Sequence, residues 1–467
     1  MMTENRQERT LEGREGDEAA SGARGEDSTG QRAYWRLIER HYRWNVGVSL
    51  AQGWFALFSM GLLLPETVLA AYLTTLTKSK LLIGLPWAFS LAYWSLPSVF
   101  YSYYLQRQRQ RRRALIVLSV LVRAAFAMMP VSAWVAVVWG ARAALIVFLA
   151  AEGLLFVTAA GAGLAWHDFM GRVLPPSRRG FFMGLREAVG QFGAFLAAAL
   201  LFVYLPKGHA SPGDYILPFA VGAFAYVISM VLFAFVREPR WPGEVVEKGT
   251  WRPYYTSMFS ILKGDRNFRT YIFVRCLLAV TCIFNFGLFA SYAITDFGIS
   301  EASVAGLFSA TELLGAVAAA AIAGRVGDRL GYKVSLLGGL AMTTLVLAAG
   351  LALKWMGAFA FAGFLAIYFL YGGQSSATWV ANFNLLLDFG RVEDRPRYIS
   401  LASLFVAPVA LAAAIMSGYL ADILGYRTVM FVALVVSVTV WITVYLVFHE
   451  PRVHRARPLP AAPAEGA

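Results

Sequence analysis

Charged residues and cysteines are both scarce in this chain. Asp, Glu, Lys and Arg make up 15% of its 467 residues, against about 25% in an average soluble domain. The two cysteines, Cys276 and Cys282, lie six residues apart in one apolar run, where they would point to different faces of a helix. We interpret them as buried apolar side chains, so a disulfide-stabilised scaffold is excluded.

The motifs of several catalytic classes are also absent. The pattern G-x-x-x-x-G-K-[ST] does not occur, so the chain has no phosphate-binding loop for an ATP-driven pump. His449 and His454 are spaced one residue too far apart for H-E-x-x-H, and no cluster of His, Cys and acids has metal-site spacing. We therefore expect no metal and no cofactor, and not an enzyme; a membrane-embedded enzyme is a remote alternative.

Long apolar runs are abundant instead. Hydrophobic residues account for 58% of the chain, and runs of about 20 residues are long enough to cross a ~30 Å hydrocarbon core. They predict an all-α membrane protein with twelve transmembrane helices, at residues 45–76, 81–104, 114–139, 141–166, 186–206, 214–236, 268–293, 302–323, 333–353, 357–386, 398–422 and 426–448.

The basic residues are distributed unevenly between the predicted loops. With the N-terminus in the cytoplasm, 29 lysines and arginines lie in or beside cytoplasmic loops and six on the opposite side. Because positive residues stay inside, this predicts a multi-pass protein of the cell (inner) membrane with cytoplasmic N- and C-termini. The same loops account for the pI of 9.8, so we expect no nucleic-acid partner.

Short repeated motifs indicate that the membrane region consists of two related halves. V-R-E-P-R ends the sixth run and F-H-E-P-R ends the twelfth, while G-R-V-L-P-P-S-R follows the fourth and G-R-V-E-D-R-P-R the tenth. The first 31 residues hold eight acids, four arginines and no apolar run, which is typical of disorder. The predicted organisation is a disordered cytoplasmic tail (1–40), a six-helix half (41–240), a cytoplasmic linker with an amphipathic helix (241–267), a second six-helix half (268–450) and a second disordered cytoplasmic tail (451–467).

The stretch G-R-V-G-D-R-L-G-Y-K, residues 324–333, lies between two apolar runs. Gly324 and Gly331 are expected to allow close helix approach and a sharp turn. We expect Asp328 to cap the following helix, and Arg329 and Lys333 to mark a cytoplasmic loop. The pattern G-x-x-x-D-R-x-G-x-K resembles the signature loop of the major facilitator superfamily of secondary transporters.

With the twelve runs, the repeat and the basic middle loop, this resemblance covers about 45–450. It implies alternating access by rocking of two halves, with spans one, four, seven and ten lining a cavity. It would place Glu66, Glu152 and Arg275 in that cavity, with Glu312 nearby, and it implies that Asp328 latches one state. The matching loop of the first half, 104–114, has neither Asp nor Gly, so this latch would depend on Asp328 alone.

Ionisable groups inside a membrane are costly and usually functional. Five fall within the predicted spans: Glu66, Arg123, Glu152, Arg275 and Glu312. Arg123 and Glu152 could instead neutralise each other as a structural pair, and Arg275 could reach the inner surface. Because three acids face two arginines, one acid should lack a fixed cation. We hypothesise that Glu66 or Glu312 carries a proton, and favour Glu66 because Pro65 loosens the helix beside it.

Two further groups of residues are candidates for the cavity and for gating. Polar and aromatic side chains suited to an amphipathic organic solute, or to helix packing alone, are Asn285, Gln374, Ser375, Trp379 and Asn382. Charged residues at the inner ends of spans four and ten, where exposed salt bridges could close a gate, are Asp168, Arg172, Arg178, Asp388, Arg391 and Arg397.

The sequence thus predicts a secondary active transporter of a small organic solute, working by alternating access and coupled to protons. Efflux is slightly favoured over uptake, because aromatics and an excess of acids suit hydrophobic or cationic solutes. The alternatives are an uptake permease or facilitator for a sugar or other metabolite and, more remotely, a lipid flippase. The expected partners are the lipid bilayer, the solute and protons, and we expect a monomer.

Overall fold

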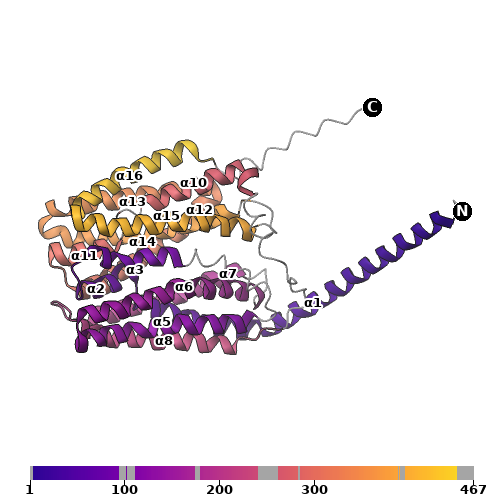
Figure 1. The fold of residues 1–467 in the computed structure, drawn as a ribbon, viewed down its shortest axis with the longest axis horizontal. Coiled ribbons are helices and arrows are strands. Elements are labelled where there is room, and N and C mark those ends of the chain that lie inside the picture. The colour runs from indigo at the N-terminus through magenta and orange to yellow at the C-terminus, as the bar shows by residue number, and fades with distance from the viewer. Residues whose placement is uncertain are drawn as a thin grey trace.

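The computed structural model shows a bundle of helices that α1 enters and α16 leaves at the same end (Figure 1). We call this the terminus end and the opposite one the far end. The structure describes the whole chain except residues 1–3, 94–100, 102–110, 174–178, 240–260, 282–283, 285, 388, 390–394 and 450–467.

The N-terminal half contains the first six predicted spans. Its elements are α1 (Glu4–Gly61), η1 (Pro65–Leu69), α2 (Ala70–Thr74), α3 (Lys80–Tyr93), α5 (Arg111–Trp139), α6 (Ala141–Val173), α7 (Arg179–Tyr204), η3 (Pro212–Tyr215) and α8 (Ile216–Phe235). Helix α5 packs along α6 and α8, and α1 packs along α7 and α8.

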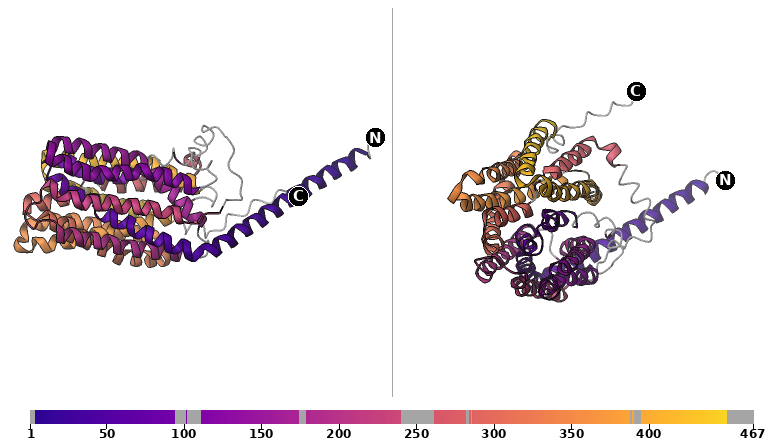
Figure 2. Two further views of the ribbon diagram at one scale, coloured as in Figure 1. Left: turned by 90° about the horizontal axis from the view of Figure 1, so that it is seen from below. Right: turned by 60° about the vertical axis from the view of Figure 1, so that its left-hand side comes forward.

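The C-terminal half contains the other six. Its elements are α10 (Arg266–Val280), α11 (Phe286–Phe297), η5 (Ser303–Phe308), α12 (Ser309–Leu330), α13 (Tyr332–Ala352), η6 (Leu353–Trp355), η7 (Gly357–Phe359), α14 (Ala360–Leu387), α15 (Arg395–Leu424) and α16 (Tyr426–Val447). Helix α14 packs along both α12 and α13. Figure 2 shows the two halves as separate groups of helices.

The lengths of these helices fit a membrane protein. Within the described residues, nine helical segments are long and apolar enough to cross a membrane. The other predicted spans correspond to α3, whose continuation lies outside the described residues, to α7 and to the pair α10 and α11. Large apolar side chains cover the outside of the bundle, which suits a surface in contact with lipid.

Two spans are interrupted where the sequence predicted continuous helices. In span one, α1 ends at Gly61 and Leu64 is extended (ψ 123°), as expected for a residue before proline. Pro65 then opens the π-helical segment η1. Span seven is divided between α10, which ends at Val280, and α11, which begins at Phe286.

The first helix begins well before the first span. Helix α1 starts at Glu4 and projects from the bundle (Figure 1). Helix α1 continues without a break into the first span. The predicted linker helix near 254–262 falls mostly outside the described residues, and so does the tail 451–467.

Candidate functional site

Two carboxyl groups meet where the halves touch. Glu66 lies on η1 of the N-terminal half and buried Glu312 on α12 of the C-terminal half, with their carboxyl groups within hydrogen-bonding reach of each other. A carboxylate accepts hydrogen bonds but cannot donate one, so a hydrogen bond between the two acids would require at least one proton on the pair. Among the described residues, neither acid forms an ion pair.

Glycines on α12 and α14 hold Glu312 in this position. A side chain at Gly372 would collide with the main-chain carbonyl of Glu312, and one at Gly315 with the carbonyl of Phe369. These two glycines therefore let α12 and α14 approach backbone to backbone. Such small residues are the usual means of close helix contact in a membrane, and here they fix the height of Glu312 along the bundle.

Two further polar contacts surround the acid pair, and the sequence did not single them out. Thr67, next to Glu66, and Ser309, one turn before Glu312, share a hydrogen bond of 2.6 Å across the interface. Tyr368 on α14 lies within electrostatic range of both acids. Its buried hydroxyl has no hydrogen-bond partner in the described part of the chain. The only sequence signal for these residues is their spacing from the acids on their own helices.

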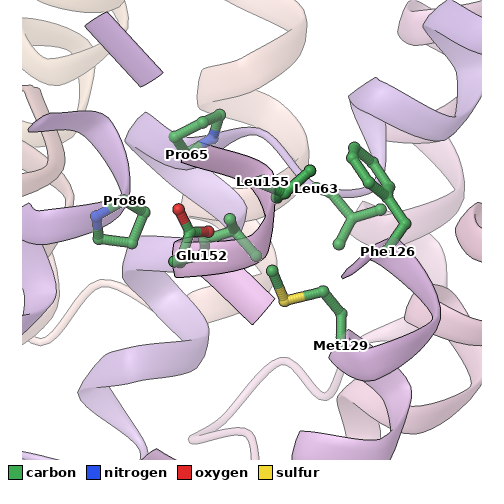
Figure 3. Close-up of a pocket in the computed structure, with 8 residues that line it drawn as sticks. Leu63, Pro65, Pro86, Phe126, Met129, Glu152 and Leu155 are labelled. Carbon is green, nitrogen blue, oxygen red and sulfur yellow. The ribbon is translucent and has the colours of Figure 1, made fainter. Parts of the chain in front are cut away.

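Glu152 occupies a different environment within the N-terminal half. It is 2% exposed and lines a cavity of about 30 Å³ between α6, α5, α3 and the break in span one. Figure 3 shows its carboxyl group among apolar and proline side chains, including Pro65, Pro86 and Met129. The cavity is large enough for a water molecule.

Arg123 does not contact Glu152, so the two residues do not form the neutralising pair that the sequence left open. Its Nε donates to the carbonyl oxygen of Tyr226 (3.2 Å) and its Nη2 to Ser229 Oγ (3.1 Å), both on α8. The guanidinium also lies 3.9 Å from the centre of the Tyr226 ring. Carbonyl oxygens and an aromatic face thus satisfy this cation, so Arg123 ties α5 to α8 and remains outside the cavity.

A cavity of about 420 Å³ lies mainly against the C-terminal half. Of the residues predicted for a solute site, it brings together Arg275, Gln374, Ser375, Trp379 and Asn382. Asn285 lies outside the described residues. Trp87 closes the inner part of the cavity by donating from Nε1 to the Tyr371 hydroxyl (3.1 Å), a contact between the halves.

Polar groups in this cavity are linked to one another. Arg275 donates from Nη1 to the Tyr271 hydroxyl (3.2 Å), which in turn donates to the carbonyl oxygen of Asn382 (3.2 Å). The side-chain oxygen of Asn382 is buried without a hydrogen-bond partner in the described part of the structure, and Gln374 donates to Thr378 (3.3 Å). The cavity therefore offers one cation and several amide and hydroxyl groups on a fixed frame.

At the far end, the halves are joined by contacts with main-chain amides. Asp422 on α15 accepts hydrogen bonds from the amides of Lys80 (2.7 Å) and Leu81 (3.2 Å) and from the Ser79 hydroxyl (3.1 Å). In return, Lys80 Nζ donates to the carbonyl oxygen of Ala421 (2.8 Å). An acid at a helix N-terminus and a cation at a helix C-terminus are both favourable, so α3 and α15 cap each other.

A second contact closes the same end. Glu301, just before η5, accepts a hydrogen bond from the amide of Ala210 (3.2 Å) and lies 3.5 Å from His209 Nδ1. Nearby, Gly306 packs so tightly against Phe202 of α7 that a side chain there would collide with it. The halves are thus closed at the far end, and the cavity extends from Tyr371 along α14 toward Leu386 and the terminus end.

Comparison with known proteins points to one family. A sequence model of the Major Facilitator Superfamily matches residues 277–465. This part of the chain is therefore similar to that superfamily. The match, together with the apolar helices of the described residues, fits a multi-pass membrane protein of the transporter type. No curated protein matches the chain in sequence.

Solved structures of several transporters share the fold of nearly the whole chain. The nucleoside transporter NupG is 12% identical with a TM-score of 0.67, and the match covers 87% of this chain and 100% of that one. A D-xylose–proton symporter is 17% identical (TM-score 0.62; 90% and 98%). A bacterial homologue of the human lysosomal transporter Spinster, in an inward-facing and unoccupied conformation, is 16% identical (TM-score 0.62; 90% and 99%).

In the loop at 324–333, the structure differs from the sequence prediction at two residues, Gly324 and Asp328. Gly331 has φ +93° and joins α12 directly to α13, as the predicted sharp turn requires. Close approach occurs at Gly327, where a side chain would collide with Tyr332, whereas nothing lies near Gly324. Asp328 lies within α12, and the position that caps α13 is Gly331, so Asp328 does not cap the following helix. Arg329 is exposed, and Lys333 Nζ donates to the carbonyl oxygen of Tyr445 (2.8 Å).

The other predicted gating residues lie at the terminus end or outside the described residues. Asp168 and Arg172 belong to the end of α6 and Arg397 to the start of α15, but the structure does not describe their side chains. Arg178, Asp388 and Arg391 fall outside the described residues. Their gating role stays a prediction.

One buried cation near this end was not anticipated. Arg186, predicted as the first residue of span five, is 8% exposed in the structure. Its Nη2 donates to Gln52 Oε1 (3.2 Å), and its guanidinium lies 4.5 Å from the centre of the Trp166 ring. It therefore links α7 to α1 and α6 in the N-terminal half.

Proposed function

We propose that this transporter moves a small polar organic solute with an anionic group by proton-coupled alternating access, and that Glu66 and Glu312 form the coupling site. The observation that carries the proposal is the close approach of the two carboxyl groups across the interface of the halves. Two carboxylates repel each other and cannot share a hydrogen bond without a proton, so closure of the far end and proton binding are linked.

The conformation supports a definite order of events. With the termini in the cytoplasm, a closed far end and a cavity extending toward the terminus end correspond to an inward-facing state. Rocking the halves the other way separates Glu66 from Glu312. Each carboxyl can then meet water, and the pair takes up its proton from the outer side. The far end closes on the protonated pair, and the proton then leaves toward the terminus end, so that one proton moves inward in each cycle. One protonation change per cycle is enough to couple transport to a proton gradient.

The cavity lining supports the solute class. Arg275 is its one cation, and the described lining includes no carboxylate. The unpaired oxygen of Asn382 and the polar groups of Gln374 and Ser375 suit a solute with hydroxyl or amide groups. The expectation of efflux depended on acids in the cavity, whereas these acids lie elsewhere. The lining thus favours an anionic or polar solute over a lipophilic cation.

The test has two stages. A thermal-shift screen of purified protein against organic anions, sugars, nucleosides, amino acids and cationic dyes identifies a solute, because binding to the folded state raises its melting temperature. Proteoliposomes with an imposed pH gradient then measure accumulation, and solute loaded on both sides measures exchange. Glu66→Gln should abolish proton-driven accumulation and retain exchange. Proton-driven accumulation at the wild-type level would reject the coupling site, and stabilisation by cationic dyes alone would reject the solute class.

A further inference from the structure

A second large hollow lies in the C-terminal half, apart from the transport cavity. It is an apolar groove of about 370 Å³ between α12 and α13, and α14 forms its floor. Small residues create it: Gly338 on α13 has no atom near the place where its side chain would be. The other residues that matter for its shape are Ile322, Val326, Met342, Phe369 and Gly373.

The groove reaches the outer surface of the bundle at membrane depth. The side chain of Ile322 on its rim is 63% exposed, and Phe369 on its floor is 43% exposed. Helices α12, α13 and α14 are each long and apolar enough to span the membrane. Since lipid chains surround these helices, an acyl chain is the apolar material next to this opening.

Positive charge lies at one end of the groove. Arg325 and Arg329 are both exposed on α12, three residues beyond the lining residues Ile322 and Val326, so each arginine is one turn nearer the terminus end. Together with Asp328 they give this turn a formal charge of +1. A phosphodiester with one negative charge complements that balance, and arginine binds phosphate in two-point geometry.

We propose that this groove binds an anionic phospholipid, whose acyl chain fills the space between α12 and α13 and whose headgroup phosphate contacts Arg329 and Arg325. The site is distinct from the transport cavity and does not depend on the proposed solute or coupling ion. A bound lipid here would brace α12, the helix that carries Glu312, against α13. It would thereby make the transporter sensitive to the lipid composition of the inner leaflet.

The experiment uses full-length protein, delipidated in detergent and titrated with phosphatidylglycerol or phosphatidylcholine, with bound lipid counted by native mass spectrometry. Gly338→Leu fills the groove, and Arg329→Gln removes a headgroup contact. Their matched controls are Gly47→Leu, at an exposed helical glycine that also has open space around it, and Arg142→Gln, at an exposed helix end on the far side.

We expect tight binding of one phosphatidylglycerol, which Gly338→Leu abolishes and Arg329→Gln weakens roughly fivefold, the effect of one surface arginine on an anionic headgroup. Phosphatidylcholine should bind more weakly and be insensitive to Arg329→Gln. The proposal is overturned if Gly338→Leu retains wild-type binding, if the two lipids bind equally well, or if soluble glycerophosphate displaces the lipid. Melting temperatures of all four variants show whether each one is folded.

Discussion

Two acid sites lie next to Pro65: the pair Glu66 and Glu312, and the single residue Glu152. They differ in the residues that surround the carboxyl groups. Glu66 follows Pro65 and meets Glu312 of the other half, whereas Pro65 itself lines the small cavity of Glu152. Burial separates them only modestly, because Glu152 is 2% exposed and Glu312 is 8% exposed, while Glu66 is partly buried. The surroundings of Glu152 all belong to the N-terminal half, while the pair spans the interface that the proposed alternating access would open. On that proposal, position at the interface, more than burial, distinguishes the coupling site.

The largest effect should come from Glu312→Gln. A glutamine amide can donate to the Glu66 carboxylate without any added proton, so the closed far end would no longer require protonation. We expect proton-driven accumulation in proteoliposomes to fall by at least about tenfold, the result of losing roughly 1.4 kcal/mol or more of linkage, while exchange persists.

Glu152→Gln is the matched control in the same assay, since it changes the same functional group at a similar depth of burial. It should retain accumulation within about twofold of wild type, a change of less than roughly 0.5 kcal/mol. If Glu152→Gln abolished accumulation and Glu312→Gln left it intact, the roles assigned to the two sites would be reversed.

The next largest effect should come from Asp422→Ala, which removes the acid that caps α3 from the other half. Hydrogen bonds to a charged group contribute about 1.5–3 kcal/mol each when buried and less at an exposed position such as this. We expect the closed far end to lose about 1–2 kcal/mol and the outward-open population to rise about fivefold or more. Spin labels at exposed Arg142 and Phe359, one on each half, would report the change as longer distances.

Asp214→Ala provides the control for this change. Asp214 accepts hydrogen bonds from the amide and hydroxyl of Ser211 at the same end, but within the N-terminal half. Its removal should lower thermal stability slightly and leave the distance between halves unchanged. An equal increase of the spin-label distance in both variants would mean that any change at the far end separates the halves. Asp422 would then have no specific role in holding them together.

A smaller effect is expected from Thr67→Val, which removes the hydroxyl hydrogen-bonded to Ser309 beside the acid pair. The buried Ser309 hydroxyl would lose its partner at a cost of about 1 kcal/mol or more to the closed state. Thr158→Val removes a hydroxyl whose hydrogen bond stays within its own helix. We expect Thr67→Val, and not Thr158→Val, to lengthen the distances between halves, and equal distances in the two variants would contradict this role.

Sequence reasoning located the acids but could not tell which ones meet. Apolar runs and loop charges predict the number and direction of the spans, because membrane thickness and the position of lysines and arginines act locally along the chain. Glu66 and Glu312 are joined only by the docking of two halves. Glu152 and Arg123 have opposite charges and could pair, but the guanidinium of Arg123 donates its hydrogen bonds to Tyr226 and Ser229 instead. A count of charges does not include such uncharged partners.

The glycines illustrate the same limit on a smaller scale. The signature loop correctly places a turn at Gly331, because a positive φ is a local property of the backbone. Which neighbouring glycine packs closely depends on the face that the helix presents, and the structure selects Gly327 over Gly324. The interruption of span seven, between α10 and α11, contains no proline that would predict it from the sequence. The interruption of span one does contain one, Pro65.

The smallest effect on transport should come from Glu152→Leu, and this variant sharpens the comparison most directly. If Glu152 is only a buried polar group in an apolar site, an apolar residue of similar size removes the cost of burying the carboxyl and places methyl groups against Met129 and Leu155. We expect an increase in unfolding free energy of about 1–2 kcal/mol, read as a higher melting temperature, with proton-driven accumulation unchanged. A stabilised protein that no longer accumulates solute would show that Glu152 also takes part in coupling. In that case, a location away from the interface would not disqualify an acid from carrying the proton.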